Sequence, residues 1–217
     1  MSSPDHSLDL DLRLPITAWF SDESFYSLCC RYHYVSGNAV AARSAQQLFG
    51  HSRNGTQHDF PSRIHVFAQR TQTLLGTPEE IIRTRTVMPF FLPWKSPQEA
   101  HHLMTMFCNG KAGKIKSLLG LPASRMRAHL PLKACPQCIH EDRQRVGVAY
   151  WHLTHQLPGV WVCLDHGCAL LESTEKSSGV GRFLWALPHE NNFYETNVRS
   201  LDPMSIKQRG IHPVKAH

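Results

Sequence analysis

The sequence lacks the features that direct a protein into a membrane or out of the cell. Its longest stretch without Asp, Glu, Lys or Arg has 19 residues, Val146 to Leu164, and is interrupted by His, Gln, Pro and Gly. A transmembrane helix needs about 20 mainly apolar residues. Residues 1–24 carry five acidic residues and one Arg, so they do not resemble the basic and then apolar start of a secretory signal. The sequence therefore predicts a cytoplasmic bacterial protein, associated with the nucleoid if it binds DNA, and no membrane partner.

Signatures of catalysis are absent as well. The dipeptide His140-Glu141 is followed by Asp, Arg, Gln and Arg, so the HExxH motif of metalloproteases is not formed. The sequence has neither the His-x-Glu that precedes Pro-Cys-x-x-Cys in zinc deaminases nor a phosphate-binding GxxxxGK[ST] loop. A G-x-S-x-G nucleophile elbow is also missing. We therefore predict that the protein is not an enzyme.

Charged residues are scarce, at 18%, yet 23 Lys and Arg exceed 17 Asp and Glu. The excess is concentrated in residues 111–145, which hold eight basic and two acidic residues. Such a stretch is typical of a surface that contacts nucleic acid, although a solvated face of a basic protein explains it equally well. The candidates for phosphate contacts are Lys111, Lys114, Lys116, Arg125 and Arg127.

The first half of the chain begins with two predicted helices. Capping side chains at 21–24 precede apolar residues at helical spacing, and Gly37 follows as a stop. Asn38 is suited to cap a second helix, which ends at Gly50. The tight Ser-Gly-Asn turn between them fits a helix-turn-helix or a helical hairpin.

Three more helix starts follow. Ser62 is predicted to cap a helix that runs to Gly76, and Thr77 and Ser96 each open a capping box with Pro at the first helical position. Residues 88–94 are aromatic and interrupted by Pro, so we expect a packed connector there. The 217 residues, 41% of them hydrophobic, suffice for one good core or two small ones.

Two pairs of metal-binding residues lie in the second half. Cys135 and Cys138 are separated by two residues, and Cys163 and His166 repeat this spacing. Two such knuckles supply four soft donors, which suits one tetrahedral zinc ion and leaves no position for a catalytic water. Cys168 is a second choice as a ligand. Seven Cys without a signal peptide also favour reduced thiols over a disulfide framework.

The segment that contains both knuckles resembles the diagnostic module of a known family. Residues 135–171 read CPQCIHEDRQRVGVAYWHLTHQLPGVWVCLDHGCALL and are similar to the zinc module of the TniQ/TnsD family of transposon target-selection proteins. Residues 21–38 resemble the opening helix of that family, and residues 76–94 resemble its Thr-Pro-Glu connector. Residues 183–190 resemble its Trp-containing strand. In all, the resemblance covers roughly residues 15–190.

The resemblance implies a function that spacing alone does not. Members of this family are non-enzymatic adaptors that recognise an attachment site on DNA or dock on a guide-RNA CRISPR complex. They recruit the AAA+ ATPase of the transposon, which activates the transposase. Carried over to this chain, the zinc ligands are Cys135, Cys138, Cys163 and His166. Nothing after His166 supplies the second Cys-x-x-Cys ribbon of many relatives, so we expect a short member or an N-terminal portion.

Taken together, the predicted fold is mainly α. A helical, helix-turn-helix-like body spans residues 15–130, a zinc-ribbon or zinc-finger module spans 131–190, and 191–217 form a tail that is either flexible or the start of a further region. A zinc-containing DNA-binding transcriptional regulator and, behind it, a zinc-dependent hydrolase are the alternative functions. A homodimer is an open alternative to a monomer.

The predicted adaptor needs a surface for the ATPase. The acidic residues 1–24, followed by the helix face of Phe25, Leu28 and Tyr32, offer one candidate. A disordered leader on an ordinary core helix accounts for the same pattern equally well.

Overall fold

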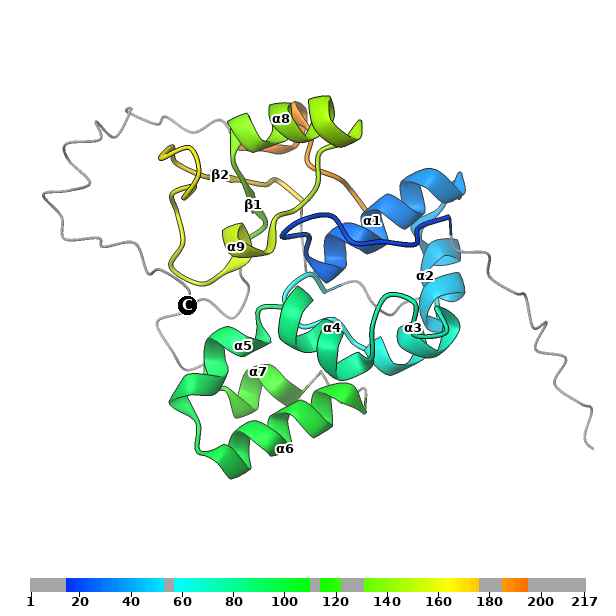
Figure 1. Cartoon of the computed structure of the whole chain (residues 1–217), viewed down its shortest axis with the longest axis vertical. Helices are drawn as coiled ribbons and strands as arrows, with labels where there is room; N and C mark the ends of the chain where they lie inside the picture. Colours follow the sequence, from blue (N-terminus) through cyan, green and yellow to red (C-terminus); the bar gives the residue numbers. More distant parts are fainter. Residues whose placement is uncertain (1–14, 53–56, 110–113, 122–130, 176–184, 195–217) are drawn as a thin grey trace, which may run out of the picture.

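A computed structural model of the chain describes residues 15–52, 57–109, 114–121, 131–175 and 185–194. It is mainly helical with little strand (Figure 1), which confirms the predicted fold class. In chain order its elements are α1 (Phe25–Ser36), α2 (Ala41–Phe49), α3 (Ile64–Arg70), α4 (Pro78–Arg85), α5 (Met88–Phe91), the 3-10 helix η1 (Leu92–Trp94), α6 (Pro97–Cys108), α7 (Ile115–Leu118), β1 (Lys133–Ala134), α8 (Pro136–Val146), α9 (Leu153–Gln156), β2 (Leu171–Glu172) and the 3-10 helix η4 (Glu190–Asn192).

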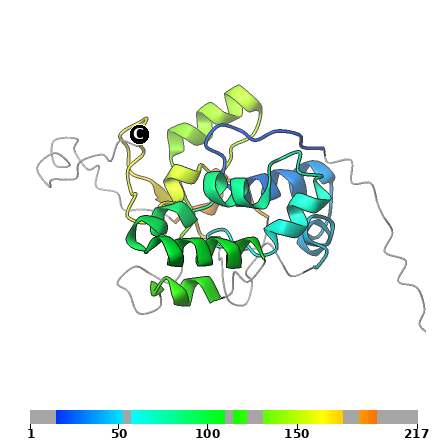
Figure 2. The same ribbon diagram turned by 60° about the horizontal axis from the view of Figure 1, so that its bottom comes forward.

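Figures 1 and 2 show how the helices are arranged. Helices α5, α6 and α7 gather at one edge of the molecule and α8 lies at the opposite edge, with α9 and the two short strands between α8 and α5 (Figure 1). Helices α1 to α4 lie between these edges or to one side of them. Among the described residues, no helix has the length and apolar character needed to cross a bilayer.

Helices α1 and α2 form the predicted hairpin, but its turn differs from the prediction in one residue. Gly37 ends α1 in the left-handed conformation, with φ of 65°. The N-cap of α2 is Val40 and not Asn38. The Asn38 amide instead donates hydrogen bonds to Ser44 Oγ at 2.9 Å and Gln47 Oε1 at 2.6 Å, so it joins the turn to the side of α2.

The capping boxes at Thr77 and Ser96 are both present, which confirms the predicted starts of α4 and α6. Helix α3 is shorter than predicted, because it ends at Arg70 and a series of turns leads on to Gly76. It begins after Arg63, which has a φ of 61° and makes no side-chain cap. The expected connector at 88–94 is itself helical and forms α5 and η1.

The core is aromatic where α1, α2 and α3 meet. The rings of Phe25 and Phe67 make an edge contact with centroids 4.9 Å apart, and Phe49 completes the group. Phe25, Leu28 and Tyr32 are 1%, 0% and 3% exposed. The prediction that they form a docking surface for an ATPase is therefore wrong, because the helix face that carries them is buried in the core. Most of the acidic leader, residues 1–14, lies outside the described residues.

One set of buried apolar side chains runs through both of the predicted domains. Leu132, Ile139 and Trp151, from the predicted zinc module, share a cluster with the core of the helical body. Trp185 adds to it from the far end of the described chain, where its ring stacks on Phe49 at 6.2 Å. Residues 185–189 form no strand, so the strand expected there is not confirmed. The domain boundaries at 130 and 190 stay predictions.

Residues 15–24 form a strap that joins the helical body to the region of α9 (Figure 1). The Asp22 carbonyl accepts a hydrogen bond from the Leu153 amide at 2.6 Å, and its carboxylate accepts one from the Thr154 amide at 3.2 Å. Glu23 forms an isolated antiparallel bridge with His152. The Asp22 carboxylate thus satisfies an amide in the first turn of α9 that has no partner within the helix.

A buried ion pair fixes the strap to α1. Arg31 makes a two-pronged contact with the Glu23 carboxylate, with N···O distances of 2.8 and 2.7 Å, and also donates to the Ala18 carbonyl. The ring of Phe20 lies 3.7 Å from the Arg31 guanidinium carbon. Because the Glu23 side chain is fully buried, the charge of Arg31 offsets the cost of removing its carboxylate from water.

Candidate metal centre

The first knuckle lies between β1 and α8. Cys135 is the N-cap of α8, and its Sγ accepts a hydrogen bond from the Cys138 amide at 3.4 Å. Pro136 takes the first helical position, where a missing amide proton is tolerated. The helix start therefore turns both thiols to the same side. Pairing of β1 with β2, with Ala134 opposite Leu171, holds this start against the strand that follows the second knuckle.

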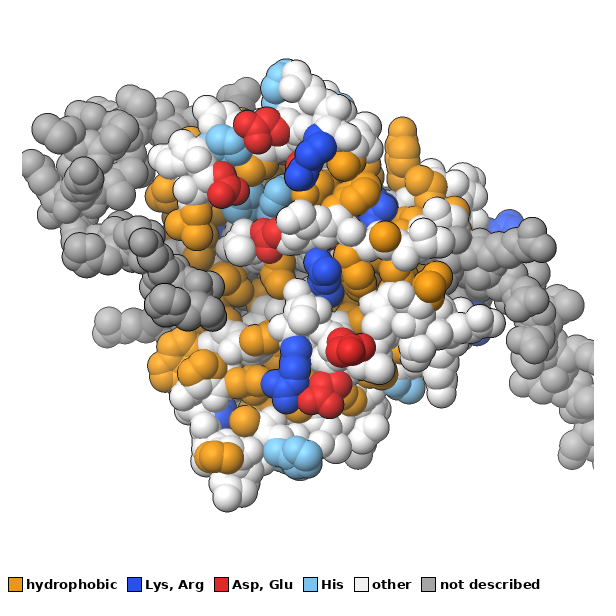
Figure 3. All heavy atoms as spheres, viewed as in Figure 1, with side chains coloured by type: hydrophobic (Ala, Val, Ile, Leu, Met, Phe, Trp, Pro, Cys, Tyr) orange, Lys and Arg blue, Asp and Glu red, His pale blue; other side chains and the backbone are white. Residues whose placement is uncertain are grey.

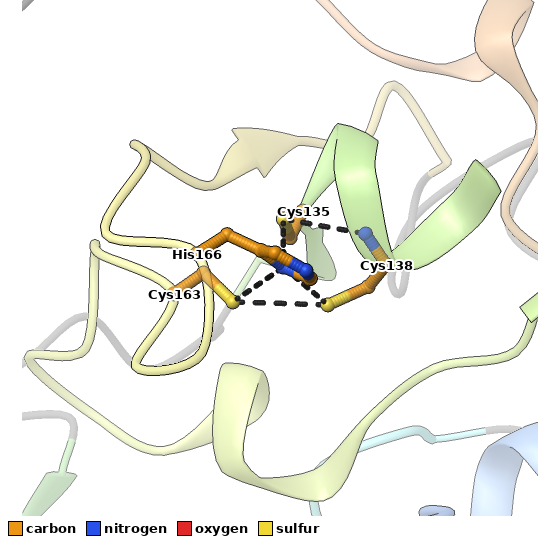
Figure 4. A group of neighbouring side chains, drawn as sticks. All are labelled: Cys135, Cys138, Cys163 and His166. Carbon is orange, nitrogen blue, oxygen red and sulfur yellow. Dashed lines mark hydrogen bonds between the residues drawn. The ribbon is translucent and has the colours of Figure 1, made fainter. Parts of the chain in front are cut away.

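The second knuckle is a tight turn between paired chain segments. The Gly167 amide donates to the Cys163 carbonyl at 2.9 Å, and Gly167 has the positive φ of 63° that glycine adopts without strain. The Cys163 amide donates to the Cys168 carbonyl at 2.8 Å, and an isolated bridge joins Val162 to Ala169. This turn presents Cys163 and His166 toward the first knuckle (Figure 4).

The structure brings the four predicted metal ligands together. His166 Nδ1 lies 3.4 Å from Cys135 Sγ, 3.3 Å from Cys138 Sγ and 3.5 Å from Cys163 Sγ. The sulfurs of Cys138 and Cys163 are 3.7 Å apart. All four donor atoms lie within 4.8 Å of one another, and the three Cys are buried (Figure 4). The cluster can hold one metal ion.

Three thiols in so small a space cannot all ionise without a cation. Hydrogen bonding from Cys138 lowers the pKa of Cys135 to about 4. The hydrogen bond of Cys138 with Cys135, together with burial and the negative charge on Cys135, raises the pKa of Cys138 well above its ordinary value, and burial raises the pKa of Cys163. A divalent ion among the sulfurs would lower the pKa values of all three thiols, because its positive charge stabilises the three thiolates at once. The donor set thus fits a metal ion better than it fits three protons.

Glu141, on α8, orients the histidine of the cluster. Its Oε1 lies 2.9 Å from His166 Nε2, and this hydrogen bond raises the pKa of His166. A proton on Nε2 that is donated to the carboxylate leaves Nδ1 free to bind a metal. In the sequence, Glu141 stands out only as part of an incomplete HExxH motif. Its position one turn after Cys138 on a helix is the signal that could have revealed it.

His155, on α9, supports the cluster from the interior. Its Nε2 lies 4.0 Å from Cys138 Sγ, while its Nδ1 is buried with no hydrogen-bond partner among the described residues. Burial lowers the pKa of His155 to about 4, so the ring is neutral at physiological pH. When its proton is on Nε2, the ring donates toward the Cys138 sulfur. Only Nδ1, which is then an acceptor, is left without a partner among the described residues. The sequence offered no signal for this contact.

A charged histidine lies next to His155 and joins α8 to the strap. Burial alone would lower the pKa of His152, but contacts with Asp142 and Asp22 raise it to about 9. His152 Nε2 lies 2.8 Å from Asp142 Oδ2, and its ring stacks on His155 with centroids 5.0 Å apart. The strap, α8 and α9 therefore meet at one protonated side chain.

The structure describes two of the five predicted phosphate contacts. Lys114 is exposed. Lys116 Nζ lies 2.6 Å from Asp59 Oδ2 with 17% of its side chain exposed, so an acidic partner within the protein offsets its charge. The other three lie outside the described residues: Lys111, Arg125 and Arg127. On the face shown in Figure 3, basic and acidic side chains lie beside one another. A role of all five in binding DNA stays a prediction.

Comparison with known proteins agrees with the resemblance read from the sequence. The family TniQ matches residues 16–170, which include the hairpin, all but the first residue of the strap, and all four donors of the cluster. The chain is 23% identical to the transposon Tn7 transposition protein TnsD of Escherichia coli over 196 residues. These aligned residues make up 90% of this chain. It spans 38% of the length of that relative. Since the match extends over most of its length, the chain belongs to the TniQ family.

Proposed function

We propose that the chain is a non-enzymatic adaptor for target selection in DNA transposition, built around one structural zinc ion. The observation that carries this proposal is the match to TniQ across the residues that contain the metal cluster. The relative that it resembles is named as a transposition protein. The adaptor would bind target DNA or a guide-RNA CRISPR complex and recruit an AAA+ regulator, which in turn acts on the transposase.

The donor spacing supports zinc as the metal. Tetrahedral zinc, with bonds of about 2.3 Å to sulfur and about 2.0 Å to nitrogen, places two sulfurs about 3.8 Å apart and a sulfur and a nitrogen about 3.5 Å apart. The corresponding distances in the cluster are 3.7 Å between Cys138 and Cys163 and 3.3 to 3.5 Å from the sulfurs to His166 Nδ1. These four distances match those of a tetrahedral zinc site, and all four donor atoms lie within 4.8 Å of one another.

The zinc would hold the fold and not take part in a reaction. Three Cys and one His from the protein fill a tetrahedron, so no position is left for a water molecule. The ligands also lie at structural junctions, because Cys135 caps α8 and Cys163 begins the turn that leads to β2. A zinc-dependent hydrolase is therefore not supported by this donor set.

Elemental analysis and a recruitment assay test the proposal together. Purified chain is expected to contain one zinc ion, and immobilised chain is expected to retain the AAA+ regulator of a Tn7-like element with and without target DNA. If the immobilised chain retains the target DNA and the ATPase at the same time, it acts as an adaptor. A free transcriptional regulator does not need the ATPase. If the chain binds the regulator neither with nor without target DNA, the adaptor role is overturned and the zinc proposal still stands.

The predicted DNA contacts have their own test. Each phosphate contact that is removed reduces the slope of log affinity against log salt by about one. Replacing all five predicted residues by Ala is expected to weaken DNA retention and flatten that slope. Arg70→Ala is the control, because Arg70 is exposed, lies outside the segment and donates to the Gln47 carbonyl. An unchanged slope in the fivefold variant, or a flattened slope in the control, would place the contact elsewhere.

A further inference from the structure

Cys168 lies beside the metal centre without belonging to its four donors. Its Sγ is 3.2 Å from Cys135 Sγ, which is closer than the 3.7 Å between the sulfurs of Cys138 and Cys163. Cys168 is partly exposed, whereas Cys135 is buried. The cluster therefore includes a fourth sulfur, which solvent can reach and which the metal does not need.

The fold holds these two sulfurs in place. Cys135 directly follows β1, and Cys168 lies three residues before β2, which pairs with β1 in antiparallel register. The carbonyl of Cys168 accepts the Cys163 amide, so the backbone at Cys168 is part of the knuckle itself. Once one of these sulfurs is oxidised to a sulfenic acid, a thiol held this close attacks it much faster than a thiol in solution does.

We propose that Cys135 and Cys168 form a disulfide when a peroxide oxidises them, and that this bond expels the zinc. The inference rests on the zinc site proposed above. A peroxide oxidises one of the two sulfurs to a sulfenic acid and releases one water. The other sulfur then attacks the sulfenic sulfur, the S–S bond forms, and the hydroxyl leaves as the second water. Cys135 and Cys168 together lose two electrons, which reduce hydrogen peroxide to two waters. One of the two protons taken up comes from the Cys168 thiol and the other from solvent, because Cys135 binds zinc as a thiolate.

Loss of the zinc follows from the count of donors. A disulfide removes the thiolate of Cys135 and leaves two thiolates and one histidine, which is one donor short of the closed tetrahedron. It also pulls the N-cap sulfur of α8 away from the Cys138 amide, whose hydrogen bond it accepts. Reduction by a dithiol reverses the bond, so the metal centre acts as a redox-sensitive switch that sets whether the module is held together.

Zinc release and disulfide mapping on the full chain test the switch. Zinc-loaded protein is treated with hydrogen peroxide while a chromogenic chelator reports free zinc, and mass spectrometry of alkylated peptides identifies the disulfide. Wild type is expected to release its zinc as the Cys135–Cys168 bond forms and to regain it after reduction in the presence of zinc. Cys168→Ser is expected to slow release about tenfold, because it removes the sulfur that closes the bond. Cys108→Ser, which alters a partly exposed cysteine on α6, is expected to behave as wild type.

The possible results separate this proposal from the zinc proposal. Release at the wild-type rate from Cys168→Ser, or a disulfide that joins other cysteines, would overturn the switch while the zinc site stands. Cys168→Ala serves as a second variant and is expected to match Cys168→Ser. If the untreated protein contains no zinc, the zinc proposal and the switch both fail.

Discussion

Replacing Cys138 by Ser removes one donor from the metal centre with little change in shape. Cys138 Sγ lies within 3.7 Å of the donor atoms of both Cys163 and His166, and the side chain is 5% exposed. A hydroxyl does not replace a thiolate as a soft ligand for zinc. We therefore expect Cys138→Ser to lose most of its zinc, from one ion per chain to a small fraction.

The size of the effect follows from the closed geometry of the site. Zinc in small structural modules supplies about 10 to 16 kcal/mol to folding, whereas a whole domain is stable by only about 5 to 15 kcal/mol. Losing even half of the metal contribution, about 5 kcal/mol, removes much of that stability. Since Trp151 is fully buried in the core that the metal region shares with the helical body, we expect its fluorescence to shift to longer wavelength in the variant.

Urea unfolding followed by tryptophan fluorescence, paired with elemental analysis, measures both effects. Cys168→Ser is the matched control, because it replaces a cysteine of the same knuckle that is not among the four donors. The control is expected to keep one zinc and nearly wild-type stability. A Cys138→Ser variant that keeps its zinc, or that loses zinc with no loss of stability, would refute the structural role argued here. Loss of zinc in the control would make Cys168 the ligand in place of one of the four.

Three further changes test contacts outside the four metal ligands. Glu23→Gln is expected to cost about 3 kcal/mol in urea unfolding because it leaves Arg31 buried without its countercharge, whereas the exposed Glu79→Gln should cost less than about 1 kcal/mol. The raised pKa of His152 stabilises the fold fully below about pH 6.5, and this contribution is lost as the pH rises through about 9. His152→Gln should therefore reduce the fall in melting temperature between pH 6 and 9.5, and an unchanged fall would contradict this assignment. Thr77→Ala should cost about 1 kcal/mol through loss of the capping box, and no measurable loss would show that the box contributes little.

Features set by neighbouring residues could be predicted from the sequence. The capping boxes at Thr77 and Ser96 depend on side chains three residues apart, and both formed as predicted. The pairs in the metal centre could be identified for a related reason, because a spacing of two residues is fixed by one tight turn. The joining of the two pairs is a long-range event, but a metal needs four donors, and this made the pairing predictable.

Features that depend on distant parts of the chain could not be predicted. The strap pairs with residues about 130 positions away, and no local pattern in 15–24 announces the Asp22 contacts with Leu153 and Thr154. For the same reason the apolar face of α1 was predicted to bind a partner when the protein itself covers it. The N-cap of α2 was predicted to be Asn38 from its residue type, but the Asn38 side chain instead donates hydrogen bonds to Ser44 and Gln47 on that helix.

A chain of contacts joins the metal ligands to the strap, which lies beyond the reach of a bound ion. Cys138 is approached by His155, on which the ring of His152 stacks, and His152 in turn contacts Asp22 of the strap at 3.7 Å. These groups pack from the metal ligands to the start of the helical body. If the metal is lost, α8 loses its fixed start and the packing of the two histidines loses one of its supports. The strap would then be held to α9 by fewer contacts, so a metal ion bound at the cluster would stabilise both the module that contains it and the junction between that module and the helices.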